Sequence, residues 1–220
     1  MNSKNNIIAI DSAGSILNIS LYKDCEITSI KGEGESSNNE ELASLLKKIL
    51  DDNSLSINNV NTILINKGPG SFTGLRIGYA FLEGIMMSVS INVAEITLLE
   101  ALRHIYSDAI NESDLICQHI RKSSYFVYNV KENKLEFIES ESIKEYLKEK
   151  NSKAFVINKI EDEYKSFDYE LLDLSDSNLP SKILIEYYIN HDVQNVSNIT
   201  DLEPNYIQKI SAKKISERIK

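Results

Sequence analysis

Residues 67–78 decide the fold, and they read Lys67-Gly68-Pro69-Gly70-Ser71-Phe72-Thr73-Gly74-Leu75-Arg76-Ile77-Gly78. An apolar run that ends at Ile65 precedes them and is typical of a strand buried on both faces. The first two glycines and the proline between them favour a tight turn. Ser71 is a good N-cap residue, and the apolar periodicity after it predicts a long helix over 72–89. The stretch therefore predicts a buried strand, a turn and a helix in direct succession.

Strands and helices alternate on both sides of this junction. The first half of the chain predicts strands at 7–10, 16–22, 26–31, 60–65 and 91–96, a helix that begins near Asn38 or Asn39, and another at 98–106. A similar order starts again at Asp114, with strands at 115–117, 125–130, 135–139, 154–158 and 169–172, and helices at 142–150 and 180–190. Two modules of three strands followed by alternation predict an α/β fold with two ribonuclease-H-like halves, the architecture of the actin-like ATPase superfamily. We place the N-terminal half, with the glycine-rich stretch, at 1–107, and a smaller C-terminal half with a tail at 108–220.

The net negative charge of the chain argues against direct binding of nucleic acid. Its 220 residues carry a formal net charge of -9, which repels phosphate backbones. The end of the chain, from Lys209 to Lys220, is nevertheless basic. The apolar run at 7–10 is too short for a signal peptide or a membrane span, so we expect a cytoplasmic protein.

The turn before the long helix suggests an anion site. The first amides of a helix point outward at its positive end, so Gly70 and Ser71, together with Asp11 after the first strand, are candidates for a remnant anion or nucleotide site. The stretch has neither the Gly-Lys-Ser/Thr of a Walker A loop nor the spacing of a nucleophile elbow. Asp11 also fits a hairpin turn in which it caps backbone amides, and we favour this interpretation. In that case Asp11→Asn should cost on the order of 1 kcal/mol or less.

The long helix carries glycines at an unusual density. Gly74, Gly78 and Gly84 each cost roughly 1 kcal/mol relative to alanine, which indicates close approach by another element. That element can be this chain's own sheet or another subunit, and both interpretations remain open. An apolar stripe runs along the same helix, and we expect it to face outward as a partner interface; its residues are Leu75, Gly78, Tyr79, Leu82 and Met86.

Three segments resemble the TsaB family. Residues 68–78 are similar to its signature, 7–12 to its opening strand and Asp-Thr/Ser turn, and 203–207 to its terminal Pro-x-Tyr-Leu motif. The resemblance implies a paralogue of TsaD, the subunit that transfers threonylcarbamoyl to the tRNA adenosine next to the anticodon. It implies a scaffold or activating role beside a TsaD-like subunit and a TsaE-like ATPase, with tRNA contacted only through the complex. It also allows a homodimer of the isolated chain.

The resemblance also locates where catalytic residues would stand. TsaD holds its metal with a His-x-x-x-His pair at the start of a helix, and alignment after residues 93–97 puts Leu98 and Leu102 at those positions. Leucine cannot bind a metal. We therefore expect no catalytic residue, no metal and no cofactor. Residues 38–40, 119–121 and 124–126 depart from the patterns of many relatives; within them only Arg121 clearly matches.

Two other functions stay open. One is a stand-alone nucleotide-dependent phosphotransferase that uses Asp11 and the loop 68–74, although nothing Gly-rich follows Asp114 to form a second phosphate loop. The other is a homodimeric interaction module with unrelated partners.

Overall fold

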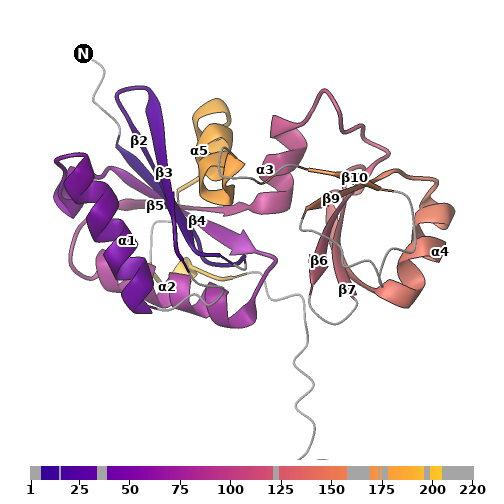
Figure 1. Ribbon diagram of the computed structural model, residues 1–220, viewed down its shortest axis with the longest axis horizontal. Helices are drawn as coiled ribbons and strands as arrows, with labels where there is room; N and C mark the ends of the chain where they lie inside the picture. Colours follow the sequence, from indigo (N-terminus) through magenta and orange to yellow (C-terminus); the bar gives the residue numbers. More distant parts are fainter. Residues whose placement is uncertain are drawn as a thin grey trace, which may run out of the picture.

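Two five-stranded mixed sheets organise this chain in a computed structural model that describes residues 6–14, 16–33, 39–120, 124–157, 169–172, 174, 178–195 and 199–204 (Figure 1). The first sheet has the order β3-β2-β1-β4-β5 and contains β1 (Ile7–Asp11), β2 (Asn18–Lys23), β3 (Glu26–Lys31), β4 (Thr62–Gly68) and β5 (Asn92–Thr97). The second has the order β10-β9-β6-β7-β8 and contains β6 (Leu115–Ile120), β7 (Ser124–Asn129), β8 (Lys134–Glu139), β9 (Ala154–Ile157) and β10 (Tyr169–Leu171).

Both sheets have the same topology. In each, the first three strands pair antiparallel as consecutive hairpins, and the fourth strand then pairs parallel with the first. The fifth strand extends the sheet by pairing parallel with the fourth. This order, repeated in two sheets, confirms the expected α/β fold with two ribonuclease-H-like halves.

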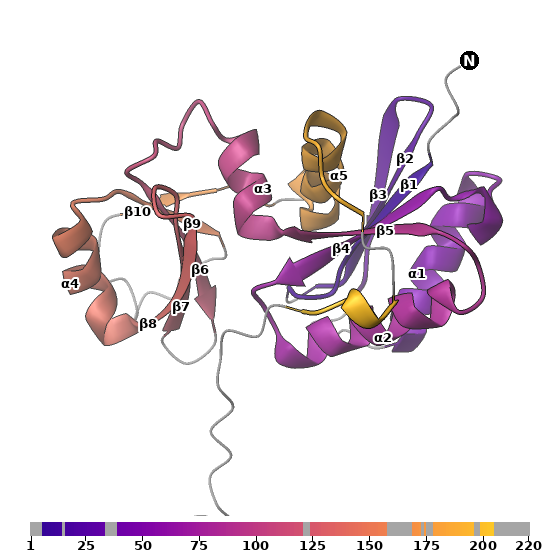
Figure 2. The ribbon, with the colours of Figure 1, turned by 180° about the vertical axis from the view of Figure 1, so that it is seen from behind.

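The helices form layers that alternate with the sheets (Figures 1 and 2). α1 (Asn39–Asp52) and α2 (Phe72–Met86) cover the outer face of the first sheet, and α4 (Ser140–Lys150) covers the outer face of the second. α3 (Leu98–Ile105) and α5 (Pro180–Asn190) lie between the two sheets. Two 3-10 turns, η1 (Ile57–Asn59) and η4 (Ile199–Asp201), complete these elements. None of the helices described is long and apolar enough to cross a membrane.

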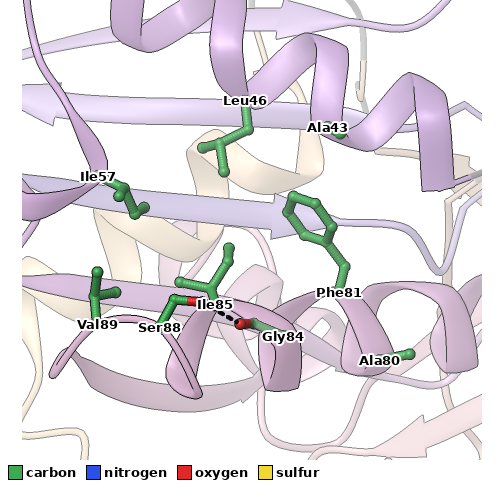
Figure 3. Close-up of a pocket in the computed structure, with 9 residues that line it drawn as sticks. All are labelled: Ala43, Leu46, Ile57, Ala80, Phe81, Gly84, Ile85, Ser88 and Val89. Atoms are coloured by element: carbon green, nitrogen blue, oxygen red, sulfur yellow. Dashed lines mark hydrogen bonds between the residues drawn. The ribbon is translucent and has the colours of Figure 1, made fainter.

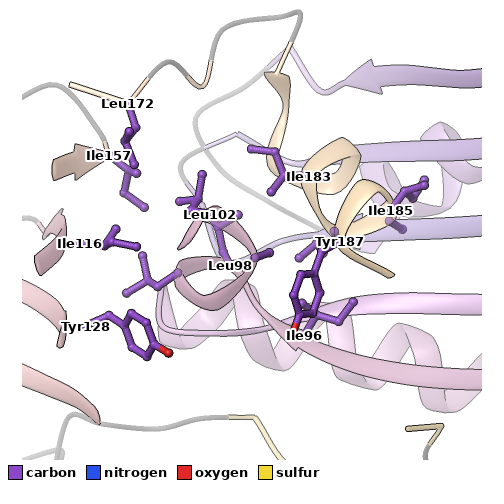
Figure 4. Packing of buried hydrophobic residues seen from close by; sticks show 14 of the residues in the cluster. Ile96, Leu98, Leu102, Ile116, Tyr128, Ile157, Leu172, Ile183, Ile185 and Tyr187 are labelled. Carbon is purple, nitrogen blue, oxygen red and sulfur yellow. The ribbon is translucent and has the colours of Figure 1, made fainter. Parts of the chain in front are cut away.

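The middle layer joins the halves through one apolar cluster (Figure 4). Ile96 comes from the first sheet, Ile116 and Tyr128 from the second, and Leu98 and Leu102 from α3 between them. α5 adds further residues of the cluster: Ile183, Leu184, Ile185 and Tyr187. Burial of this kind, at about 25 cal/mol per Å² of apolar surface, makes the two halves depend on each other for stability.

The C-terminal part of the chain differs from the expected division at residue 107. After β10 the chain returns to the first half, where α5 packs on β1 and β2 and contacts α3. The segment 199–204 also lies on the first half, because Leu202 packs against the apolar cluster beneath α1 and α2. The first sheet is therefore covered partly by residues from the C-terminal end of the sequence.

Candidate functional site

The turn after β1 packs directly on the start of α2. The backbone amide of Ser71 donates a hydrogen bond of 2.8 Å to the carbonyl oxygen of Ala13. A Cβ atom added at Gly70 would lie 2.4 Å from that oxygen, and one at Gly74 would lie 2.0 Å from the carbonyl oxygen of Ser12. At Gly78 it would lie 2.2 Å from the hydroxyl of Ser12. Glycine at these three positions therefore allows the start of α2 to pack closely against the turn after β1.

This packing occupies one amide of the expected anion cradle, that of Ser71. Ser71 is the N-cap of α2, as expected, because its hydroxyl accepts a hydrogen bond from the amide of Gly74 at 3.2 Å. The backbone amide of Ser71 itself already donates to the carbonyl oxygen of Ala13. A phosphate at this position would have to displace that carbonyl before it could use the amide of Ser71.

Asp11 lies beside this junction with its carboxylate surrounded by donors. Its side chain is 1% exposed, and Oδ1 accepts from the amide of Ala13 at 3.2 Å and from the amide of Asn66 at 2.6 Å. Oδ2 accepts from the side-chain amide of Asn18 at 3.1 Å. Burial raises the pKa of Asp11, and the hydrogen bonds of Asn66 and Asn18 oppose that shift. The bond to Ala13 is the turn-capping geometry favoured from the sequence.

Two asparagines extend the network from Asp11 to distant elements. The side-chain oxygen of Asn66 accepts from the amide of Gly68 at 3.0 Å, and that of Asn18 accepts from the amide of Ser181 at 2.8 Å. Asp11 thus connects the Gly68 turn with the first turn of α5. Sequence reasoning missed Asn18, Asn66 and Ser181, because each lies in an element whose apolar pattern gave no reason to single out its polar residue.

The stripe expected to face a partner points inward. Leu75, Gly78, Tyr79 and Leu82 are buried against this chain's own first sheet, and Met86 is half-buried. The expectation that this stripe lies outward is wrong for the four buried residues, since they fill the core beneath α2. That α2 takes part in a partner interface stays a prediction.

The outer side of α1 and α2 carries an apolar pocket (Figure 3). It measures about 560 Å³ and is lined by Ala43, Leu46, Ile57, Ala80, Phe81, Gly84, Ile85, Ser88 and Val89. At Gly84, an exposed residue of this lining, an added Cβ would meet no atom within 4 Å. Two exposed apolar side chains lie at the ends of α2, Phe72 at the start and Met87, 84% exposed, just past the last residue. Gly84 is thus a helical glycine that packing within the described chain does not explain.

The positions of the expected metal pair belong to the core. Leu98 is 4% exposed and Leu102 is fully buried, and both point into the middle cluster (Figure 4). Within the described residues no group of three or more His, Cys, Asp and Glu side chains could hold a metal ion. These leucines do not fit a metal site.

Known proteins resemble this chain in sequence and in fold. The family model of TsaD, tRNA N6-adenosine threonylcarbamoyltransferase, matches residues 35–160, which is more than half of the chain. The chain belongs to this family.

Within the family, several curated relatives that it matches are TsaB proteins. The tRNA threonylcarbamoyladenosine biosynthesis protein TsaB of Buchnera aphidicola subsp. Baizongia pistaciae is 34% identical over 85 residues, which cover 39% of this chain and 38% of that protein. TsaB of Escherichia coli strain K12 is 25% identical over 93 residues, 42% of this chain and 40% of that protein. TsaB of Buchnera aphidicola subsp. Acyrthosiphon pisum is 24% identical over 71% of this chain and 70% of its own length. The match covers less than half the length of the first two relatives. The three TsaB relatives confirm the resemblance to the TsaB family.

Solved structures of TsaB relatives share the fold. YeaZ from Pseudomonas aeruginosa superposes with a TM-score of 0.66 at 15% identity and covers 92% of this chain and 99% of its own. A second Pseudomonas aeruginosa structure, described as similar to peptidase YEAZ, gives a TM-score of 0.68 at 16% identity over 93% of this chain and 100% of its own. The whole described architecture, both halves included, is therefore that of the YeaZ structures.

Proposed function

We propose that this chain is a non-catalytic subunit in the formation of threonylcarbamoyladenosine on tRNA, and that it binds and activates a TsaD-like transferase. The observation that carries the proposal is the pair Leu98 and Leu102, two buried leucines where the family resemblance puts metal ligands. A family member with this core in place of the metal site keeps the fold but lacks the groups for the transfer step. The names of the TsaB relatives supply the pathway.

The junction beside Asp11 favours this role over a phosphotransferase. The amide of Ser71 donates to the carbonyl oxygen of Ala13. The carboxylate of Asp11 accepts from the backbone amide of Ala13 and from the side-chain amides of Asn18 and Asn66. A phosphotransferase needs an open helix N-terminus and a carboxylate that can reach a phosphate-bound metal. In this arrangement the amide of Ser71 and the carboxylate of Asp11 are already engaged within the chain.

We place the partner surface on the outer side of α1 and α2. The pocket there is apolar, and the pair of helices covers the face of the first sheet opposite α3 and α5. Open space above Gly84 allows a partner helix to approach the α2 backbone closely. Exposed apolar surface of this kind is typical of protein interfaces.

Gly84→Leu tests this surface. Because a Cβ atom at position 84 meets no atom within 4 Å, the variant should fold normally and melt at or above the temperature of the unchanged protein. It should capture a TsaD-like transferase at least about tenfold more weakly, which is about 1.4 kcal/mol of binding free energy. Transfer of threonylcarbamoyl to tRNA by the mixture should fall in parallel, and the chain without the transferase should transfer none.

A matched control is Lys144→Leu on α4, an exposed helical position far from the pocket. This variant should capture the transferase as the unchanged chain does. If Gly84→Leu captures the transferase normally, the interface lies elsewhere. If the unchanged chain only self-associates and Gly84→Leu abolishes that dimer, the surface serves a second copy and the proposal fails.

A further inference from the structure

Two of the three histidines of this chain meet in the structure, although they are far apart in the sequence. His104 lies in the last turn of α3, and His191 is the C-cap of α5. Both are partly exposed, and their ring centroids are 4.3 Å apart. Two imidazoles that bind one metal ion have centroids roughly 4.5–5 Å apart, because each ligating nitrogen lies about 2.1 Å from the ion. A small rotation of either ring therefore lets both rings contact a shared ion.

His191 is held in the way that metal-binding histidines commonly are. Its Nδ1 lies 2.9 Å from the carbonyl oxygen of Tyr187, and because a carbonyl oxygen only accepts, Nδ1 carries the proton. The neutral ring then has its lone pair on Nε2, which is the nitrogen left for an ion. Metal-binding histidines usually donate their other N–H group to a carbonyl or carboxylate, which fixes the orientation of the ring. The ring of Tyr187 also stacks on that of His191, with centroids 4.4 Å apart.

The surroundings of the two rings carry negative charge. His104 and His191 lie at the C-terminal ends of α3 and α5, and a helix C-terminus has a partial negative charge that attracts cations. Glu100 lies one turn before His104 on the same face of α3 and adds a carboxylate. The opposing charge is Arg103, whose guanidinium interacts with the hydroxyl of Tyr128 in the second sheet. Two helix ends and a carboxylate therefore favour a cation beside the histidines.

We infer that His104 and His191 form a two-histidine site for Zn²⁺ at the meeting point of α3 and α5. Imidazole nitrogen suits Zn²⁺, whereas Mg²⁺ prefers oxygen ligands. Among the described residues no group of three or more His, Cys, Asp and Glu could hold a metal, so water fills the remaining positions around the ion. The site differs from positions 98 and 102, where the leucines face the core, and it is independent of the proposed function.

An ion at this point ties together two helices that cover the first sheet. α3 follows directly from β5, whereas α5 returns to the first sheet from the C-terminal part of the chain. The two ligands come together only when both helices are packed, so the ion binds the folded chain and stabilises it by mass action. Zn²⁺ therefore holds α5 against α3.

The test uses an untagged chain with Cys25→Ser, because Cys25 is an exposed thiol and thiolates also bind zinc. Zn²⁺ binding is measured by isothermal titration calorimetry at about pH 7.5, with and without excess Mg²⁺. His104→Gln and His191→Gln are each compared with His119→Gln, the matched control, which removes the third histidine on β6. His191→Phe is a further variant, because it keeps a ring against Tyr187 but has no nitrogen.

We expect about one Zn²⁺ per chain in the Cys25→Ser protein and in the His119→Gln control, with Mg²⁺ unable to compete. Each change at position 104 or 191 should weaken binding at least about tenfold, since even a group behind a ligand typically contributes that much. Relative to EDTA, Zn²⁺ should raise the melting temperature of the control but not of the variants at 104 and 191.

Three outcomes overturn the two-histidine site. The first is a Cys25→Ser chain that binds no Zn²⁺. The second is an equal loss of affinity in His119→Gln and in the variants at positions 104 and 191. The third is a loss at only one of those two positions, because the ion then binds a single histidine.

Discussion

Gly74 and Gly84 lie on the same helix in different surroundings. A methyl group at Gly74 would lie 2.0 Å from the backbone oxygen of Ser12, which cannot move without shifting the turn after β1. We expect Gly74→Ala to destabilise the fold by about 3 kcal/mol or more. Gly84→Ala meets open space and should stabilise α2 by up to about 1 kcal/mol. Thermal and urea unfolding of the two variants check both values; a mild Gly74→Ala would mean that the turn after β1 packs differently.

Asp11 gives a second prediction at the scale of one residue. In Asp11→Asn, the new NH2 group must face an NH2 group that already donates, that of Asn66 or that of Asn18. Neither of these side-chain amides can rotate to offer its oxygen instead, because the two oxygens accept from the amides of Gly68 and Ser181. We expect a loss of about 1–3 kcal/mol, more than the turn alone suggested. The free energy of unfolding in urea measures it.

Asp114→Asn is the matched control for Asp11→Asn. Asp114 is also buried in a turn, but a single oxygen, Oδ2, accepts both of its hydrogen bonds, from the backbone amide and the side chain of Asn111. Asn can keep that oxygen in place, so this change should cost less than about 1 kcal/mol. Equal costs for the two variants would contradict the donor conflict at Asp11.

The sequence revealed Asp11 as a turn residue but not its partners. Its capping of Ala13 is local and follows from residue type. Asn66 reaches it across the parallel pairing of β1 with β4, and Asn18 across the hairpin of β1 and β2. A contact between two strands depends on their register. An apolar pattern shows which residues are buried, but it does not show which polar residues of neighbouring strands lie side by side.

At the scale of elements, α3 and α5 meet through a group of aromatic rings. His104 of α3 lies edge-on to His191 after α5, with ring centroids 4.3 Å apart, and Tyr187 stacks on His191 at 4.4 Å. Burial lowers the pKa of His104, His191 and Arg103 lower it further, and Glu100 opposes them. A base whose pKa is lower in the folded state stabilises the fold above the unfolded pKa, near 6.5, and loses that contribution as the pH falls.

We therefore expect a lower melting temperature at about pH 5.5 than at pH 7.5, with part of the difference due to His104. His104→Gln removes the titrating group and should narrow the difference. Melts of both proteins at the two pH values test this. An unchanged difference in the variant would assign the pH dependence to other groups.

Helix α2 shows what periodicity can and cannot give. Its spacing and the N-cap at Ser71 correctly predicted where the helix begins. The stripe of Leu75, Tyr79 and Leu82 was also a real apolar face, but it faces the core. Phe81 and Ile85 make a second apolar strip that lines the outer pocket. Spacing identifies a face but not its partner, so two apolar faces on one helix cannot be assigned from the sequence alone.

At the scale of the whole molecule, the order of elements predicted the two sheets. Three strands followed by alternation specify hairpins and then parallel crossovers, and the same order appears twice. The return of α5 to the first sheet could not be predicted this way. Its apolar residues fit either sheet equally well, and the deciding contact, the amide of Ser181 on Asn18, joins positions 163 residues apart.

That return has a consequence for how the protein is made. The inner face of the first sheet, with Ile7, Ala9, Leu64 and Ala94, is covered by α3 and α5 together. On the ribosome, the strands of that sheet emerge long before residues 180–190, so the nascent chain carries an uncovered apolar face through most of its synthesis. We expect residues 1–113 made alone to aggregate or to bind a hydrophobic dye, and the full chain to do neither. A fragment that stays in solution and melts cooperatively would contradict this. The first half of the molecule is completed only when α5 packs on it, so we expect a chain released before residue 190 to be prone to aggregation.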